Sequence, residues 1–418
     1  MTFRRASISA AVSALNTLGR SLQRGGWPLF SLDERAFVAE AVRRTGLEDY
    51  GGHDFQEPLG LLLRCLDTEA HLTPLGRITA RRDTLELLET RLRMVEDRKR
   101  NPGIAATPIK APLFIVGLPR TGSTLLHHLL AQDPGGRVAL AWEVMFPSPP
   151  PERARYETDP RIALCEKRLR WLDRIAPEFK TIHPLGARLA LECLAIMGGS
   201  FRSWRFNTMY RVPTYQQWLG GEDPRLAYQF HRSFLQHLAW GVPAERWVLK
   251  APSHLHALDA LFETYPDALV VQTHRDPVTV MASVASLTAV LRRAFSDRVD
   301  LAEIGRDVLQ YWARGTEAAV RVRRSSCIAP ARFLDVKYQE LASDPIGTVR
   351  RVYAHFDLAF TASAEAAMRR HLADRAQHRH RRHEYSLDEF ALDPEEIAAA
   401  FKTYRDHFDV RPEPAPYS

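Results

Sequence analysis

A loop with two glycines, an arginine and several hydroxyl residues lies near position 120. The surrounding sequence is PLFIVGLPRTGSTLLHHLL, from Pro112 to Leu130. Its apolar start predicts a buried parallel strand over Leu113–Val116. The five residues between Gly117 and Ser123 let the main chain curl around a phosphate-sized anion at the N-terminus of the next helix. The segment therefore predicts a strand, an anion-binding loop and a helix.

The loop has the geometry of a nucleotide-binding P-loop but a different cation. The position where a P-loop NTPase carries its lysine is Ser123, followed by Thr124, and the nearest cation is Arg120 within the loop. The P-loop lysine reaches the β- and γ-phosphates of a nucleotide triphosphate. Its absence makes an ATP or GTP site the less favoured interpretation.

These residues resemble the 5′-phosphosulfate loop of sulfotransferases that use 3′-phosphoadenosine-5′-phosphosulfate (PAPS), especially the arm that includes protein-tyrosine sulfotransferases. A second segment, Trp247–Leu287, is similar to the core of that family: a strand ending in Lys-x-Pro, a helix, a strand ending in Arg-Asp-Pro and a helix with a serine. In the family, the arginine and the serine stand eight residues apart and hold the 3′-phosphate. Arg275 and Ser283 have that spacing.

The resemblance implies a PAPS-dependent sulfotransferase that moves a sulfuryl group to a hydroxyl acceptor by in-line transfer. The cradle for the 5′-phosphate is expected to be Arg120, Thr121, Gly122, Ser123, Thr124 and Leu125. Lys250, at a strand end, is expected to assist the leaving phosphate. Positive charge then comes from Lys250 and Arg120, so the chemistry needs no metal.

Glu143 is the expected general base, because tyrosylprotein sulfotransferases carry a catalytic glutamate shortly after the loop helix. An ion pair of Glu143 with Arg120 is a structural alternative that is compatible with this role. Small-molecule sulfotransferases use a histidine instead, which keeps His127 and His128 in consideration. A carboxylate beside arginine and lysine remains ionised and able to accept a proton.

Two later segments complete the expected nucleotide site. Tyr338, in VKYQELASDP, matches the tyrosine that lies beside the adenine in the family. Arg379 and His383, in the cluster RHRRH, resemble the basic loop that closes over the 3′-phosphate. An alternative for Arg275 is a salt bridge with Asp276 or another carboxylate, and an alternative for the cluster is a solvated loop.

Alternating strands and helices after Pro112 predict an α/β fold, a P-loop-like parallel sheet flanked by helices and preceded by a helical segment. Strands are expected at Leu113–Val116, Trp247–Leu249, Leu269–Thr273 and Phe333–Val336. Residues 1–107 are expected to form the N-terminal helical segment and residues 108–418 the sulfotransferase domain. A helical, aromatic-rich insertion at about 151–243 is expected to supply the acceptor pocket, although each single aromatic residue is more simply explained as core.

Composition is consistent with a globular enzyme of 418 residues. Fifty-seven Lys and Arg against 50 Asp and Glu give a net charge of +7, which suits a polyanionic ligand. The four cysteines form no C-x-x-C pair and the chain has no uninterrupted apolar span of transmembrane length. We therefore expect a cytoplasmic enzyme without a transmembrane segment, acting on a small molecule, a lipid or a glycan, and not on nucleic acid.

Two rival functions follow from the same residues. One is a P-loop kinase that uses Mg-ATP. The other is a basic protein without catalytic activity that binds nucleic acid or an anionic membrane through the RHRRH segment. The acceptor and the oligomeric state do not follow from the sequence.

Overall fold

The computed structural model describes residues 10–27, 30–175, 185–325, 327–377 and 386–413. Its centre is a parallel sheet of five strands in the order β2-β3-β1-β4-β5. The strands are β1 (Leu113–Gly117), β2 (Gly136–Arg137), β3 (Arg246–Lys250), β4 (Leu269–His274) and β5 (Phe333–Lys337). The expected fold class and the four expected strands are confirmed. The two-residue β2 carries too little apolar pattern to be recognised in the sequence.

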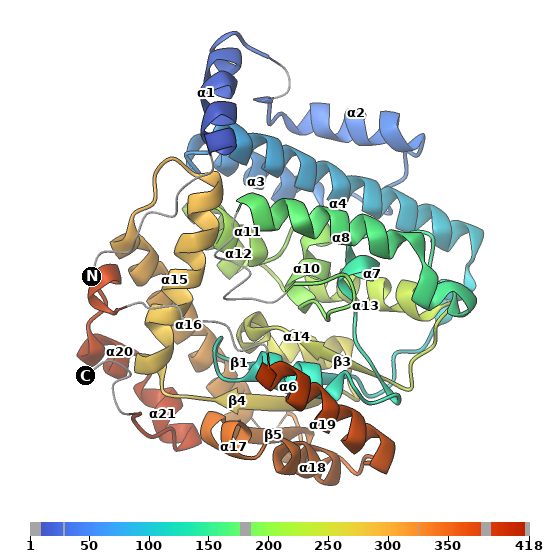
Figure 1. Cartoon of the computed structure of the whole chain (residues 1–418), viewed down its shortest axis with the longest axis vertical. Helices are drawn as coiled ribbons and strands as arrows, with labels where there is room; N and C mark the ends of the chain where they lie inside the picture. The colour runs from blue at the N-terminus through green and yellow to red at the C-terminus, as the bar shows by residue number, and fades with distance from the viewer. Residues whose placement is uncertain (1–9, 28–29, 176–184, 326, 378–385, 414–418) are drawn as a thin grey trace.

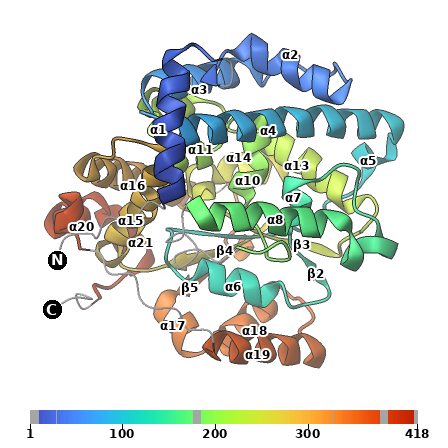
Figure 2. The same ribbon diagram turned by 45° about the horizontal axis from the view of Figure 1, so that its top comes forward.

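Helices cover both faces of the sheet. Successive side chains of β1 point to opposite faces, and each set packs against its own group of helices. Leu113 and Ile115 pack with α6 (Ser123–Leu130), α18 (Pro345–His355) and α19 (Ala362–Gln377). Phe114 and Val116 pack with α14 (Leu258–Thr264) and α16 (Leu301–Arg324) on the other face. Figure 1 shows α6, α18 and α19 close together in the lower part of the molecule, and in Figure 2 they lie below the sheet. Burial on both faces explains why β1 reads as a continuous apolar run.

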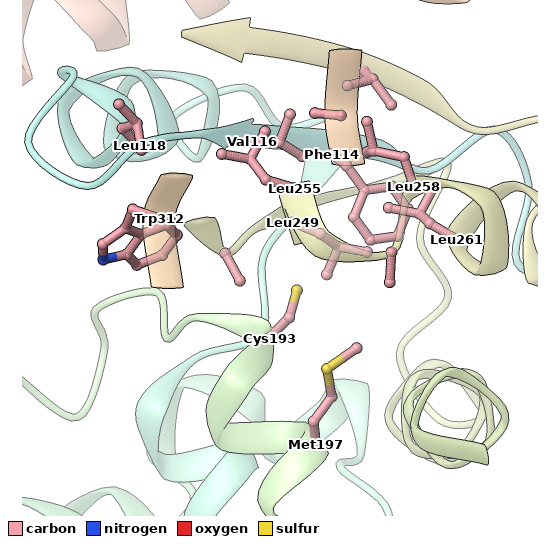
Figure 3. Close-up of a cluster of buried hydrophobic side chains, with 14 of the residues drawn as sticks. Phe114, Val116, Leu118, Cys193, Met197, Leu249, Leu255, Leu258, Leu261 and Trp312 are labelled. Carbon is pink, nitrogen blue, oxygen red and sulfur yellow. The ribbon is translucent and has the colours of Figure 1, made fainter. Parts of the chain in front are cut away.

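The largest hydrophobic cluster joins the sheet to the helices between β2 and β3, residues 138–245, which we call the middle segment. Figure 3 shows Phe114, Val116 and Leu249 from the strands beside Leu255, Leu258 and Leu261, with Cys193 and Met197 approaching from α10 (Cys193–Met197). The middle segment therefore shares a core with the sheet.

The N-terminal segment is helical, as expected. Its helices are α1 (Ala10–Arg24), α2 (Glu34–Thr45), α3 (Gln56–Thr68), α4 (Pro74–Arg100) and α5 (Gly103–Ala106). The middle segment contributes α7 (Ala141–Met145), α8 (Pro160–Ile175), α10, α11 (Arg205–Met209), α12 (Pro213–Gly221) and α13 (Arg225–Ala239). Phe37 and Leu88 share one hydrophobic cluster with Phe206 and Tyr215 of the middle segment. In Figure 2, α4 lies across α11 and α10.

The other α-helices in the part of the chain that the structure describes are α15 (Pro277–Phe295), α17 (Tyr338–Ser343), α20 (Pro394–Ala400) and α21 (Lys402–Phe408). The segment after Tyr338 forms two helices, because Asp344 ends α17 and caps α18 before Pro345. Helix α15 has the length and hydropathy of a membrane-crossing helix, but 72% of that span is buried inside the protein.

Candidate functional site

The expected anion-binding loop connects β1 to α6. Gly117, Arg120 and Gly122 all have positive φ angles, 134°, 65° and 86°. A Cβ on residue 117 would lie 2.3 Å from the carbonyl oxygen of Thr273. The position at which the chain turns away from β4 therefore requires glycine. The loop therefore brings main-chain N–H groups to the N-terminus of α6, the arrangement that binds anions.

Thr121 fixes the shape of the loop. It is fully buried, and its hydroxyl donates to the carbonyl of Leu118 at 2.7 Å and lies 2.6 Å from the Thr273 hydroxyl. The Thr273 hydroxyl also contacts the carbonyl of Val116 at 3.1 Å. Thr121 thus ties the loop to β4 through its side chain.

Lys250 reaches the first turn of α6 from β3, the strand beside β1. It ends β3, where it pairs in register with Ile115 of β1. Its side chain is buried, and Nζ donates to Thr124 Oγ1 at 3.3 Å and forms an ion pair with Glu192. The structure therefore places the expected catalytic lysine at the carboxyl edge of the sheet, where open α/β folds bind ligands.

Arg275 contacts the anion-binding loop from the end of β4. Its Nη1 donates to the carbonyl oxygen of Arg120 at 3.3 Å, and its guanidinium lies 3.9 Å from the centre of the Tyr338 ring. Arg275 also forms a salt bridge of 3.0 Å with Glu413, so a carboxylate partner does exist, although it is not Asp276. Tyr338 flanks the loop as well, since a Cβ on Gly122 would lie 3.3 Å from its ring.

The remaining residues expected to bind the nucleotide are Ser283, Ser123, Leu125, Arg379 and His383. Ser283 is buried in the second turn of α15, the helix that begins two residues after Arg275. Among the hydrogen bonds of the described residues, Arg275 reaches the loop and Ser283 does not. Ser123 and Leu125 lie in the first turn of α6, where they offer main-chain N–H groups. Arg379 and His383 lie outside the described residues.

Glu143 occupies an enclosed position in α7. Its carboxylate accepts a hydrogen bond from Arg137 Nη2 at 2.6 Å and another from the main-chain N–H of Leu140 at 2.9 Å. The side chain is fully buried, and the Arg137 guanidinium packs 4.6 Å from the Trp247 ring. The ion-pair partner of Glu143 is therefore Arg137 and not Arg120.

His127 has a structural environment. Its Nε2 donates to the carbonyl of Val248 at 3.2 Å, and the side chain is buried. Burial, and next the positive charge of Lys250, lower the pKa of His127 well below its ordinary value. His128 packs its ring 6.0 Å from that of His371. The histidine alternative to a catalytic glutamate gains no support from these positions.

A cavity of about 450 Å³ lies beside the loop, with Pro119, Glu192, Pro252 and Ser253 at that end. Its wall is largely apolar and comes from α4, α7, α8, α10, α11, α13, α15 and α16, with the apolar residues Ile78, Leu87, Val144, Met145, Leu169, Leu172, Leu194, Met209, Phe230, Phe234, Leu287, Leu291, Val308 and Trp312. Of the aromatic residues in the expected insertion at about 151–243, Trp171 and Trp204 line the cavity, whereas Tyr210, Tyr215 and Tyr228 are buried in the core.

Sequence reasoning missed Glu192. It lines the cavity, pairs with Lys250 and immediately precedes α10. A signal was present, since Glu192 is the only charged residue in the apolar run LALECLAIM. An isolated carboxylate in such a run needs a partner or a function, because burying a charge alone is costly.

Comparison with known proteins identifies relatives that are sulfotransferases. The pattern of the sulfotransferase family matches residues 112–362. The chain is similar to two solved structures, sulfotransferase STF1 from Mycobacterium tuberculosis H37Rv and sulfotransferase STF9 from Mycobacterium avium. The alignment with STF1 has 36% sequence identity and a TM-score of 0.78, and it covers 88% of this chain and 97% of the STF1 chain. The alignment with STF9 has 29% sequence identity and a TM-score of 0.80, and it covers 90% of this chain and 97% of the STF9 chain.

A curated relative is the omega-hydroxy-beta-dihydromenaquinone-9 sulfotransferase Stf3 of Mycobacterium bovis, which is 25% identical over 67% of this chain and 71% of its own length. The chain belongs to the sulfotransferase family and is an enzyme of that class.

Proposed function

We propose that this enzyme transfers the sulfuryl group of PAPS to a hydroxyl of an apolar small molecule or lipid. One observation carries the proposal: Arg275 contacts the loop between Gly117 and Ser123, and Lys250, which ends another strand, contacts Thr124 in the first turn of the helix that follows this loop. Their convergence puts two cations and an array of N–H groups in one place, next to an apolar cavity. The arrangement suits a nucleotide with charged groups at both ends and an acceptor with little charge.

The residues present fit PAPS. The loop offers N–H groups and the Ser123 hydroxyl to a 5′-phosphate, the Arg275 guanidinium is suited to a 3′-phosphate, and the Tyr338 ring offers an apolar face beside both. PAPS, when bound, supplies the sulfuryl group for in-line displacement. Arg120 and Lys250 then stabilise negative charge on the transferred group and on the leaving phosphate.

The general base is proposed to be a glutamate, and two candidates are available. Glu143 was expected from the sequence and is enclosed with Arg137. Glu192 lines the acceptor cavity and touches Lys250, so a hydroxyl in the cavity can reach it directly. Because a general base must lie within hydrogen-bond distance of the proton that it removes, the geometry favours Glu192.

The apolar wall favours an acceptor with an aliphatic or aromatic body over a glycan, whose many hydroxyls would lose hydration there. The relative Stf3 is named for a hydroxylated menaquinone, which has this character. We further propose a reducing, cytoplasmic setting, since Cys65, Cys165, Cys193 and Cys327 are all unpaired thiols.

The test is transfer of ³⁵S from labelled PAPS to long-chain alcohols and to a lipid extract, with thermal-shift measurements beside it. The proposal predicts labelled sulfate esters and stabilisation by adenosine 3′,5′-bisphosphate but not by Mg-ATP. Stabilisation by Mg-ATP alone, with phosphoryl transfer, would indicate a kinase. Binding to nucleic acid or anionic vesicles that disappears at moderate salt, without any response to the bisphosphate, would indicate a charge-driven binding protein.

A further inference from the structure

Helix α8 presents an exposed face that carries apolar and basic side chains but no acidic ones. From Ala163 to Arg174 the exposed positions recur at intervals of three and four residues, the spacing of one helix face. These positions, which we call the α8 stripe, are Ala163, Leu164, Lys167, Arg170, Trp171 and Arg174. The stripe therefore has basic charge and no negative charge to balance it.

The two large apolar side chains of the stripe are open to solvent. Leu164 is 54% exposed and Trp171 is 39% exposed, and among the described residues they are the only pair of exposed large hydrophobic side chains that share one helix. Single exposed hydrophobic residues are common on protein surfaces, but a pair two turns apart beside several cations indicates a contact surface. Figures 1 and 2 both show α8 facing the viewer and running alongside α4.

The basic side chains of the stripe have no acidic partners within the described residues. Lys167, Arg170 and Arg174 form no ion pair there, whereas the next basic residue of the helix, Arg168, pairs with Glu86 of α4. The charges of the stripe are therefore available to an anionic surface.

The α8 stripe borders the apolar cavity. Trp171 belongs both to the stripe and to the cavity wall. Its neighbours one turn away along the helix, Arg168 and Ile175, also line the cavity. Lys167, Arg170 and Arg174 are not among the lining residues. The apolar edge of the stripe is therefore the edge next to the cavity.

This combination fits a lipid surface better than another macromolecule. Tryptophan at the level of the headgroups, leucine just below them and lysine or arginine beside anionic lipids are the features of a helix that lies in a membrane interface. An acidic protein or a nucleic acid would satisfy the charges alone. A bilayer also offers an apolar phase to Leu164 and Trp171, and that phase continues into the apolar wall of the cavity.

We propose that the α8 stripe docks the enzyme on an anionic membrane surface, with Leu164 and Trp171 at the headgroup level, so that a lipid acceptor passes from the bilayer into the cavity. The inference rests on the proposed function for the identity of the acceptor, whereas docking itself can be measured without any transfer reaction.

The first test is flotation of the whole protein with vesicles of phosphatidylcholine, alone or mixed with phosphatidylglycerol, with adenosine 3′,5′-bisphosphate present. The wild-type enzyme should partition about tenfold or more in favour of the anionic vesicles. The triple variant Lys167→Gln, Arg170→Gln, Arg174→Gln should lose about tenfold or more of this binding, because each cation near an anionic surface contributes to it. Leu164→Ser should lose about fivefold.

A matched control separates the stripe from total charge. The triple variant Arg306→Gln, Arg321→Gln, Arg324→Gln removes the same charge from exposed positions of α16 and should lose less than about twofold. No preference of the wild-type enzyme for anionic vesicles, or equal losses in the two triple variants, would overturn the inference.

A second readout reports whether α8 itself enters the interface. A polarity-sensitive dye on Leu164→Cys, in a Cys327→Ser background because Cys327 is the exposed cysteine of the described residues, should shift to the blue with anionic vesicles. The same dye on Trp240→Cys, an exposed tryptophan position at the end of α13, should not shift. The same shift at both positions, or none at residue 164, would contradict docking through α8.

Transfer of ³⁵S connects the surface to the acceptor. The stripe triple variant should label a long-chain alcohol in anionic vesicles about tenfold more slowly than the wild type, but the same alcohol delivered by a cyclodextrin within about twofold of the wild type. Equal loss from both sources would overturn delivery from the bilayer. The proposed function fails separately, if neither source is labelled and the bisphosphate does not bind, and flotation still decides the docking.

Discussion

Arg275 Nη1 donates to the carbonyl oxygen of Arg120 across 3.3 Å, although 155 positions separate the two residues in the sequence. This bond joins the loop that follows β1 to the end of β4. Both strands are central in the sheet and parallel, so their carboxyl ends must meet at one edge. The contact turns two separate motifs into one candidate nucleotide site.

Replacing Lys250 with methionine should lower turnover by a hundredfold or more. Methionine keeps much of the buried aliphatic volume but cannot stabilise charge on the leaving phosphate, a loss of several kcal/mol of transition-state stabilisation. Steady-state transfer from labelled PAPS measures the effect. Affinity for adenosine 3′,5′-bisphosphate, measured by calorimetry, should change by less than about threefold. Turnover near that of the wild type would contradict the role.

The two glutamates are distinguished by a pair of variants. Glu192→Gln should lower turnover about a hundredfold and shift its pH profile, since a general base is lost. Glu143→Gln should instead lower the free energy of unfolding in urea by about 3 kcal/mol, because the enclosed Arg137 loses its charged partner. If Glu143→Gln folds as stably as the wild type but is inactive, the base is Glu143.

Glu413 should compete with a 3′-phosphate for Arg275. Its carboxylate lies 3.0 Å from the guanidinium, and its main-chain N–H donates to Asp276 at 2.9 Å. Glu413→Gln removes the charge, so the affinity for adenosine 3′,5′-bisphosphate should rise about threefold to tenfold. The control is Glu395→Gln, an exposed change in α20. Weaker binding by Glu413→Gln would show that the carboxylate supports the site.

His127 should contribute to acid sensitivity and not to catalysis. Burial lowers the pKa of His127 in the folded protein, so below about pH 6.5 the unfolded chain binds more protons than the folded chain. The free energy of unfolding therefore decreases as the pH is lowered through this range. His127→Gln should reduce that slope by up to about 1.4 kcal/mol per pH unit and leave turnover within about threefold. Denaturant melts between pH 5 and 8 measure the slope. An unchanged slope with lost activity would refute the structural role.

Local patterns in the sequence predict the sheet and the loop well, because apolar runs and glycine positions are set by residues close together in the chain. The strands around Leu113 and Leu269 and the turn at Gly122 are of this kind. The contacts of Glu143 and Glu192 are not, since their partners Arg137 and Lys250 are chosen by tertiary packing. The same holds for α4, which reads as a plain helix although its Arg82 and Glu86 line the cavity.

The central claim is that one site holds both charged ends of the nucleotide, and calorimetry on Arg275→Ala tests it most directly. The ligands are adenosine 3′,5′-bisphosphate and adenosine 5′-monophosphate, which differ only in the 3′-phosphate. We predict a loss of about tenfold to a hundredfold for the bisphosphate, as expected for charge-assisted hydrogen bonds, and less than about twofold for the monophosphate. Equal losses for both ligands, or no loss for the bisphosphate, would contradict the claim.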